Sequence, residues 1–431
     1  MRIAVVGSGI AGLASAWWLS RRHEVMLFEG NDYLGGHTHT HDVEMAGKRY
    51  AIDSGFIVFN PDNYPLLSAL FETLGVASQP TTMSFSVHSE RSGVEYNATS
   101  LDALFCQRRN LLSPRFLGML ADLARFYRQA PALLEVAGPG PTLGEYLREG
   151  RYGRAFRDEH LVPMASALWS SPPQRILEFP ARYLVQFMAH HQMLTLGRRS
   201  PWRVVQGGSA TYVRALRKRW RVQERLGCSV EAVRRDEQGV ELETARGRER
   251  FDHVVLACHS DEALELLHDA DERERRILGA IRYQSNDTVL HTDARLLPRR
   301  SKAWAAWNAH VPRDPAAPCT VSYCMNVLQG VESPDPFVVT LNRSEAIDPA
   351  RVLKRMHYRH PVYDHAMVAA QQRRSEIQGQ RRTWFAGAYW GWGFHEDGIR
   401  SAHDVVTALD PRCHETTAAR VPVAHGEAVP A

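Results

Sequence analysis

A glycine-rich turn near the start of the chain has the spacing of a nucleotide phosphate site. Gly7, Gly9 and Gly12 fit the pattern G-x-G-x-x-G. In this pattern the first glycine permits a tight turn, the second lets a pyrophosphate approach the backbone, and the third lets a helix pack against a sheet. Free N–H groups at the start of that helix attract anions. The turn therefore predicts a phosphate site that includes Ile10 and Ala11 as well as the three glycines.

The elements around this turn provide the context that such chemistry needs. Arg2 to Val6 predicts a buried strand, Ala11 to Ser20 a helix, and Glu24 to Phe28 a second buried strand. Glu29 ends the second strand, where a carboxylate accepts hydrogen bonds from ribose hydroxyls and repels a 2′-phosphate. This unit indicates a parallel sheet. It does not distinguish FAD from NAD, because both molecules contain ADP.

Three further segments carry a family resemblance. They read YLGGHTHT at Tyr33 to Thr40, DSGF at Asp53 to Phe56, and TWFAGAYWGWGFHEDGIRSA at Thr383 to Ala402. With the first turn, they resemble the flavin amine oxidase superfamily, which includes monoamine oxidases and phytoene-type desaturases. Within it the chain is most similar to a bacterial group described as predicted NAD/FAD-binding proteins. The resemblance implies FAD as the cofactor and an α/β fold, in which a Rossmann-like FAD-binding domain carries an inserted α+β substrate domain.

The resemblance also implies which residues bind the cofactor. Gly35 and Gly36 are expected to line the pyrophosphate, and Gly387 to lie near the ribityl chain. Val230 is expected to meet the adenine through its backbone. The start of the last helix is expected to lie near the flavin with four residues, Glu396, Asp397, Gly398 and Ile399. A helix N-terminus at this edge would stabilise the anionic reduced flavin.

Titratable and aromatic side chains stand beside these motifs. His37 follows the double glycine, where the usual amine oxidase pattern has Arg, and we interpret it as a phosphate or flavin contact. His395 is the best titratable candidate for catalysis near the flavin. Tyr389 and Trp392 are candidates for the flavin face, with simple core packing as the alternative for these aromatic rings.

Two observations narrow the chemistry. His37, His39 and His41 alternate and share one face of an extended segment, but no acid or thiol is spaced to complete a metal site, so we expect no metal. Many amine oxidases also place a Lys on a substrate-domain strand to hold a water against the flavin. The comparable strand here, Asn286 to His291, has no Lys. These departures weaken amine oxidation and leave desaturation or isomerisation open.

Composition sets broad limits on the class of protein. The 431 residues suit two or three domains, and the net charge of +4 gives no case for nucleic acid binding. The six cysteines include no Cys-x-x-Cys pair, which favours free thiols in a reducing compartment. The first strand starts at once, so no signal peptide fits before it, and no apolar run is long enough to span a membrane. We therefore expect a cytoplasmic protein.

The chain pattern predicts a discontinuous domain organisation. Residues 1–90, 200–275 and 376–410 are expected to form the FAD-binding domain, 91–199 and 276–375 the substrate domain, and 411–431 a disordered tail. The stretch from about residue 66 to 199 is mostly helical in pattern. Within it, Leu111 to Tyr127 mixes apolar residues with arginines. A core-facing helix is the favoured interpretation, and peripheral membrane contact is the alternative.

Together these features predict an FAD-dependent oxidoreductase that transfers a hydride from an organic substrate to the flavin. The expected substrate is a small molecule or lipid, apolar or acyl-lipid in character, in a desaturase-like or dehydrogenase-like reaction. Some members of the bacterial group are tied to modification of membrane fatty acyl chains. Two alternatives stay open, an amine oxidase that uses oxygen and a non-catalytic dinucleotide-binding protein. The oligomeric state is not predicted.

Overall fold

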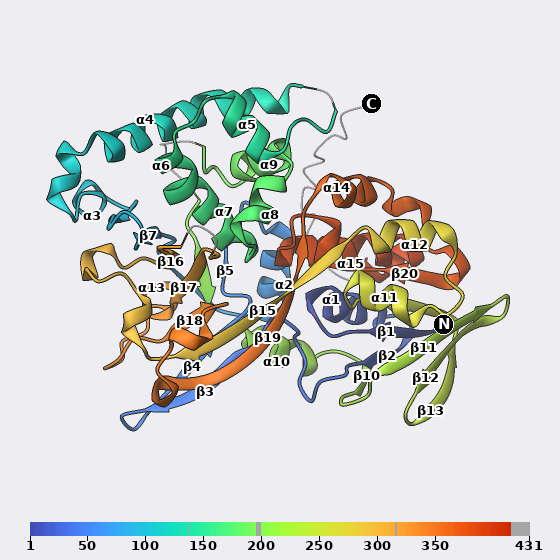
Figure 1. Ribbon diagram of the computed structural model, residues 1–431. Helices are drawn as coiled ribbons and strands as arrows, with labels where there is room; N and C mark the ends of the chain where they lie inside the picture. Colours follow the sequence, from blue (N-terminus) through green and yellow to red (C-terminus); the bar gives the residue numbers. More distant parts are fainter. Residues whose placement is uncertain (137, 195–199, 315–316, 415–431) are drawn as a thin grey trace.

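The computed structural model describes residues 1–136, 138–194, 200–314 and 317–414 (Figure 1). Its first sheet is parallel and has five strands in the order β10-β2-β1-β14-β20. These strands are β10 (Val222–Arg225), β2 (Glu24–Phe28), β1 (Arg2–Val6), β14 (His253–Leu256) and β20 (Thr383–Phe385). They come from three distant parts of the chain. The expected α/β, Rossmann-like fold class is thereby confirmed.

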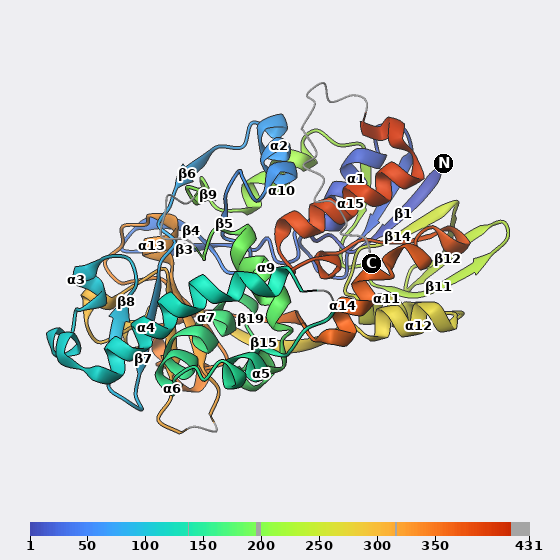
Figure 2. The same cartoon turned by 90° about the horizontal axis from the view of Figure 1, so that it is seen from above.

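Alternate residues of β1 enter two separate cores. Ile3 and Val5 pack with helices α1 (Ile10–Leu19) and α15 (His395–Leu409), which lie side by side on one face of the sheet (Figure 2). Ala4 and Val6 pack on the other face. The same layer of helices includes α2 (Pro65–Leu74) and α10 (Ala210–Arg217). Burial on both faces explains why the central strands β1, β2 and β14 are almost wholly apolar.

An antiparallel meander covers the second face. It consists of β11 (Val230–Asp236), β12 (Gly239–Thr244) and β13 (Gly247–Phe251), and it is followed by α11 (Ser260–Leu266) and α12 (Glu272–Gly279). Phe251 ends β13, and the chain breaks at Asp252, whose carboxylate accepts a hydrogen bond from the N–H of Arg2 at 2.7 Å. This break lets β14 start anew beside β1.

The second large sheet has seven strands in the order β19-β15-β18-β17-β16-β7-β8. They are β19 (Val352–Val362), β15 (Arg282–His291), β18 (Val338–Leu341), β17 (Thr320–Cys324), β16 (Trp307–Val311), β7 (Phe85–Ser89) and β8 (Glu95–Asn97). The expected domain boundary at residue 90 thus falls between two strands of one sheet. Strand β7 reads Phe-Ser-Val-His-Ser, a short alternating pattern that the expected mostly helical interpretation of this region missed.

Helices lie over one side of this sheet (Figure 1). They are α3 (Leu101–Leu104), α4 (Pro114–Gln129), α5 (Leu143–Glu149), α6 (Arg154–Phe156), α7 (Val162–Trp169), α8 (Pro173–Glu178) and α9 (Ala181–His190). Pro114 stands in the first turn of α4, where proline needs no hydrogen-bond partner. None of the helices in the described residues combines the length and apolar character that crossing a membrane requires.

Shorter elements complete the fold. They are β3 (Thr40–Met45), β4 (Lys48–Asp53), β5 (Val58–Phe59), β6 (Ser78–Pro80), β9 (Arg203–Val205), α13 (Met325–Gln329) and α14 (His365–Gln372). Residues Pro411–His414, the start of the expected disordered tail, form a short 3-10 helix in which Cys413 is fully buried. The rest of the expected tail lies outside the described residues.

Candidate active site

The three glycines of the first turn meet different surroundings. A Cβ atom at Gly12 would lie 1.9 Å from the carbonyl oxygen of Gly7, so this glycine is required for the turn itself. Gly7 has a φ of +96°, which favours glycine. A Cβ at Gly9 would meet nothing within 4 Å. Gly9 precedes α1, and no side chain caps this helix. The space in front of Gly9 and the free N–H groups of α1 fit a pyrophosphate.

The double glycine packs against this turn. A Cβ at Gly36 would lie 3.1 Å from the Cα of Gly9. The N–H of Gly35 donates to the carbonyl oxygen of Ser8 at 3.1 Å and lies 3.2 Å from its hydroxyl oxygen. The two glycine motifs, almost thirty residues apart in sequence, therefore border one space. This arrangement fits the expected pyrophosphate contacts of Gly35 and Gly36.

Glu29 follows β2 and already holds four hydrogen bonds. One carboxylate oxygen accepts from the N–H and hydroxyl of Ser8 at 3.0 and 2.5 Å. The other accepts from the N–H and the side-chain amide of Asn31, both at 2.8 Å. The sequence interpretation did not include Ser8 and Asn31, although Ser and Asn beside a carboxylate are ordinary donors. Ribose hydroxyls at Glu29 would share the carboxylate with these donors.

The hydrogen bonds of the segment before Val230 bring it near Glu29. The segment before it runs along the residues after β2, because the N–H of Cys228 donates to the carbonyl oxygen of Glu29 at 2.9 Å. The N–H of Gly227 donates to the carbonyl oxygen of Asn31 at 2.8 Å. Val230 begins β11 and is half-buried. Its position beside the ribose carboxylate fits the expected backbone contact with adenine.

The segment from Thr383 to Ala402, which we call the closing motif, contacts the glycine-rich turn at Gly398. A Cβ at Gly398 would lie 2.6 Å from Cγ2 of Ile10. The hydroxyl of Ser401 donates to the carbonyl oxygen of Gly398 and accepts from the N–H of Gly387, both at 2.8 Å. Ile399 is fully buried beside them. The close approach of α15 to α1 thus fixes the end of β20 relative to the glycine-rich turn.

Two buried carboxylates of this motif cap helices. Glu396 accepts hydrogen bonds from the N–H groups of Leu66 and Leu67 at the start of α2, both at 3.1 Å. Asp397 accepts from the N–H of Phe394 at 3.0 Å and closes the first turn of α15. Helix α15 begins at His395, so both carboxylates lie in its first turn. Burial raises the pKa of Glu396 to about 7 and that of Asp397 to about 6.

His395 is half-buried between the segment that follows the double glycine and the start of α15. Its ring stacks on Phe56 at 3.7 Å between centroids, and its Nε2 lies 2.9 Å from the hydroxyl of Thr38. Burial lowers the pKa of His395 to about 3, so the ring is neutral at neutral pH. A neutral, hydrogen-bonded imidazole can position a neighbour or donate a hydrogen bond, but it carries no charge.

Tyr389 and Trp392 lie in the loop between β20 and α15. The ring of Tyr389 packs over Gly387, where a Cβ would lie 2.1 Å from it. The hydroxyl of Tyr389 and the indole N–H of Trp392 are buried and have no partner among the described residues. Gln371 of α14 holds this loop, since its amide donates to the carbonyl oxygens of Tyr389 and Gly391 at 2.8 and 2.7 Å. Sequence reasoning gave no signal for Gln371.

A group of histidines gathers beside the double glycine. The ring of His37 lies 5.1 Å from that of His360 and 4.9 Å from that of Tyr358, both on β19. Its buried Nε2 has no hydrogen-bond partner among the described residues. Burial is the main cause that holds the pKa of His37 well below its usual range, and the nearby histidines add to it. Burial also lowers the pKa of His360 to about 4.

The predicted shared face of the alternating histidines is consistent with their contacts. His39 Nδ1 lies 3.1 Å from the hydroxyl of Tyr358, and the rings of His39 and His41 are 4.1 Å apart. His360 itself is oriented by Asn286 of β15, whose Nδ2 lies 2.7 Å from the Nδ1 of the ring. Asn286 stands on the strand where a Lys was sought, and the sequence did not reveal that it contacts a histidine.

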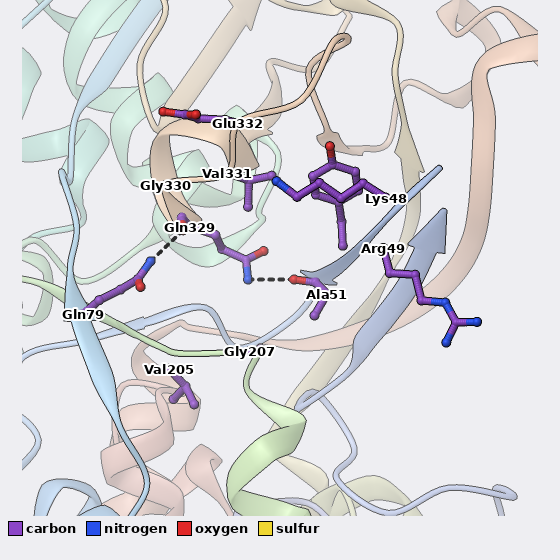
Figure 3. Close-up of a pocket in the computed structure, with 12 residues that line it drawn as sticks. Lys48, Arg49, Ala51, Gln79, Val205, Gly207, Gln329, Gly330, Val331 and Glu332 are labelled. Atoms are coloured by element: carbon purple, nitrogen blue, oxygen red, sulfur yellow. Dashed lines mark hydrogen bonds between the residues drawn. The ribbon is translucent and has the colours of Figure 1, made fainter. Parts of the chain in front are cut away.

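A separate cavity of about 270 Å³ lies between β4, β9 and α13 (Figure 3). Its wall includes Lys48, Arg49 and Glu332. The buried amide of Gln329 donates to the carbonyl oxygen of Ala51 at 3.2 Å, and the amide of Gln79 donates to that of Gln329 at 2.9 Å. Gly207 and Gly208, which precede α10, also line this cavity. None of the cofactor-motif residues lines it. It is distinct from the candidate cofactor site.

Comparison with known proteins identifies the class to which this fold and site belong. The model of the family described as flavin containing amine oxidoreductase matches residues 10–290, which is well over half of the chain. The chain therefore belongs to the flavin-containing amine oxidoreductase family. It is an FAD-dependent oxidoreductase, and FAD is the cofactor that the glycine motifs fit.

Two curated relatives match parts of the chain. A carotenoid phi-ring synthase from Chlorobaculum tepidum is 30% identical over 161 residues, which cover 36% of this chain and 23% of the relative. A putative flavin-containing monoamine oxidase, AofH, from Mycobacterium tuberculosis is 26% identical over 271 residues, which cover 59% of this chain and 56% of the relative. The matches thus span about a quarter and about half of the relatives' lengths.

Solved structures share the fold over nearly the whole chain. A putative protoporphyrinogen oxidase from Exiguobacterium sp. has a TM-score of 0.67 at 18% identity, with 95% of this chain and 99% of that chain covered. A fatty acid isomerase from P. acnes has a TM-score of 0.65 at 16% identity, with 95% and 98% covered. At these identities the likeness extends to the fold alone.

Proposed function

We propose that this FAD-dependent oxidoreductase dehydrogenates an apolar, acyl-lipid-like substrate. The observation that carries the proposal is the pair formed by Asn286 and His360. Asn342 donates to the Oδ1 of Asn286 at 2.6 Å, which leaves the amide N–H of Asn286 to face the ring of His360 at 2.7 Å. Asn286 of this neutral pair therefore stands on β15, the strand where many amine oxidases place a charged Lys, and His360 faces it from the neighbouring strand β19. Because this strand has no Lys, the chain lacks a feature that many amine oxidases use.

The hydrogen bond from Asn286 also determines which nitrogen of the His360 ring carries the proton. Because Asn286 donates to Nδ1, the single proton of the neutral ring belongs on Nε2. With the pKa of His360 lowered to about 4, the ring stays neutral at physiological pH. His37 and His395 also have lowered pKa values because of burial. These imidazoles supply hydrogen-bond donors and acceptors without a fixed charge, which suits an uncharged substrate.

Apolar side chains line the neighbourhood of the closing loop. The ring of Trp392 lies 5.8 Å from Phe187 and 6.1 Å from Tyr183, between centroids, and these belong to α9. Aromatic walls exclude water and favour apolar ligands. When bound, FAD supplies the acceptor for a hydride from a substrate C–H bond. The residues of this chain would hold the substrate and exclude water.

Amine oxidation with oxygen is the second candidate. The putative monoamine oxidase from M. tuberculosis, which matches more of this chain than the carotenoid phi-ring synthase does, favours it. The name of the other relative refers to a carotenoid, which is an apolar molecule. The side chains near β15 support the first candidate over the second.

Anaerobic flavin reduction across a substrate panel tests the proposal. The holoenzyme is mixed without oxygen with long-chain acyl lipids, with primary amines, and with NADH or NADPH, and the loss of flavin absorbance is recorded. We expect reduction by a member of the acyl-lipid set. Reduction by amines, with peroxide release once oxygen is admitted, would replace the proposal by the second candidate. A flavin that no member of the panel reduces would also contradict it.

A further inference from the structure

Exposed leucines gather at one end of the molecule. Leu101 of α3, Leu111 and Leu112 of the 3-10 helix η1 (Arg108–Leu112), and Leu117 of α4 are 76%, 50%, 87% and 43% exposed. We call these four residues the leucine tip. Among the described residues only Met1, Val136 and Leu353 are other large apolar side chains of comparable exposure. The tip lies at the end of the molecule opposite β11 to β13 (Figures 1 and 2).

The leucine tip is built on a folded frame. Ser100 caps α3 and Ser113 caps α4, each by accepting a hydrogen bond from a backbone N–H. The rings of Phe105 and Phe116 contact each other at 5.7 Å between centroids, which ties the end of α3 to the start of α4. Helix α4 buries Phe116, Met119 and Phe126, as a core-facing helix should. The leucines of the tip are not part of that buried face, so core packing does not explain them.

Basic side chains surround the tip. Six cations come from η1, α4 and the loop that contains η5 (Ser301–Ala303): Arg108, Arg109, Arg115, Arg299, Arg300 and Lys302. Three carboxylates pair with four of them. Asp102 forms ion pairs with both Arg108 and Lys302. Glu95 pairs with Arg300 at 2.8 Å, and Glu159 pairs with Arg115 at 3.0 Å. These named side chains therefore leave an excess of positive charge around the exposed leucines.

We propose that the leucine tip docks on an anionic phospholipid bilayer. Leu111 and Leu112 would enter the boundary between headgroups and acyl chains, and the basic side chains would face the anionic headgroups. Apolar residues ringed by cations match both layers of such a surface. Contiguous exposed apolar side chains are uncommon on proteins that contact only water. The inference does not depend on which substrate the flavin oxidises.

Vesicle flotation of the holoenzyme tests the docking surface. The vesicles contain phosphatidylcholine alone or phosphatidylcholine with about 30% phosphatidylglycerol. We expect binding to the anionic vesicles that weakens with added salt, and at least about tenfold weaker binding to the neutral ones. Leu111→Gln/Leu112→Gln should lower binding to the anionic vesicles by about tenfold. Leu353→Gln, an exposed leucine outside the tip, is the matched control and should bind as the wild type does.

Flavin content and thermal unfolding show whether each variant is folded. Arg109→Gln/Arg299→Gln, which keeps all four leucines, should weaken anionic binding and reduce its dependence on salt. The proposal is overturned if the wild type does not float with anionic vesicles. It is also overturned if the double leucine variant, folded and flavin-loaded, binds as tightly as the wild type. Self-association of the wild type that the leucine substitutions abolish, without vesicle binding, would assign the tip to a second copy of the chain instead.

Discussion

Gly9 and Gly12 stand three residues apart, but the structure gives their missing side chains different consequences. A side chain at Gly9 points into open space, whereas one at Gly12 collides with the carbonyl oxygen of Gly7. We therefore predict that Gly9→Val leaves the apoprotein folded and abolishes FAD binding, because the side chain fills the pyrophosphate space. Flavin absorbance after purification and thermal unfolding measure the two effects.

The control for Gly9→Val is Gly12→Val. Its side chain meets backbone, so it should lower the stability of the protein itself as well as its flavin content. A fully flavin-loaded Gly9→Val protein would show that the glycine-rich turn is not the phosphate site.

Glu396 should give the protein a pH-dependent stability. Its pKa rises from 4.5 to about 7 on folding, chiefly through burial. A raised carboxyl pKa means that the folded state holds the proton more tightly, so this stabilisation is complete below pH 4.5 and is lost as the pH rises towards 7. Glu396→Gln keeps an acceptor for one of the two N–H groups, of Leu66 or Leu67, and does not titrate. The unfolding free energy of the wild type should therefore fall relative to Glu396→Gln, by up to about 3 kcal/mol, between pH 5 and 8.

Denaturant titrations at several pH values measure this difference. Asp53 also has a raised pKa, but it titrates in both proteins and so cancels. A difference between the two proteins that does not change with pH would contradict the prediction.

Asn286 is expected to position His360. In Asn286→Leu the Nδ1 of His360 loses its donor, so the ring is free to rotate and to exchange tautomers. One such hydrogen bond is worth about 1 kcal/mol, which corresponds to roughly a fivefold to tenfold slower anaerobic flavin reduction. The flavin content should not change. Partial recovery of the rate in Asn286→Gln, together with an altered pH profile in Asn286→Leu, would separate positioning from a merely structural role. A full rate in Asn286→Leu would remove Asn286 from the site.

At the scale of elements, the contact between α1 and α15 links the phosphate site to the closing motif. Gly398→Leu must move α15 away from Ile10, because even a Cβ would lie 2.6 Å from it. If the N-terminus of α15 faces the flavin, the anionic reduced form loses about 1–2 kcal/mol. For a two-electron couple about 30 mV corresponds to 1.4 kcal/mol. The flavin midpoint potential should then fall by tens of millivolts, or FAD binding should fail.

Ile10→Ala distinguishes packing from electrostatics in this prediction. Combined with Gly398→Ala it makes room for the added methyl group and should restore thermal stability to near that of Ile10→Ala alone. Tight FAD binding with an unchanged potential in Gly398→Leu would mean that α15 does not face the flavin. Tyr389 and Trp392 would then lose their claim to the active site as well.

Local sequence was enough to predict the elements that carry the glycine motifs. The strands at Arg2 to Val6 and Glu24 to Phe28 coincide with β1 and β2, because a buried parallel strand is apolar throughout. Strand β7 was not foreseen, because its alternating pattern is short. Of its two partners, β8 is close in sequence but has only three residues, and β16 lies more than 200 residues away. Helix α15 begins at His395, and Asp397, a residue inside the motif, closes its first turn.

The residues of the candidate site also fall into two groups: those that local sequence could indicate, and those whose contacts only the folded structure shows. The glycines and Glu29 follow local rules of spacing, so the sequence located them. The contacts of Gln371 with the closing loop, of Glu396 with α2 and of Asn286 with His360 join parts of the chain that no local pattern connects. Such pairings depend on how the sheets and helices pack, and only the folded structure reveals them.

At the scale of the whole molecule, the chain crosses between the two large sheets several times. The five parallel strands come from both ends and the middle of the chain, and the seven-stranded sheet fills the intervals between them. This arrangement places β15 and β19, which carry Asn286 and His360, next to the histidines that follow the double glycine. Cofactor contacts and expected substrate contacts thus meet where the two parts of the molecule join.

The identity of the bound cofactor tests this account most directly. The purified protein is heated to release its flavin, and the supernatant is separated by chromatography against FAD and FMN standards. We predict FAD at about one molecule per chain, since the motifs form a site for the ADP half that FMN lacks. The same treatment of Gly9→Val should release little or none. Recovery of FMN alone, or of FAD in equal amount from Gly9→Val, would contradict the assignment of the glycine motifs to the cofactor.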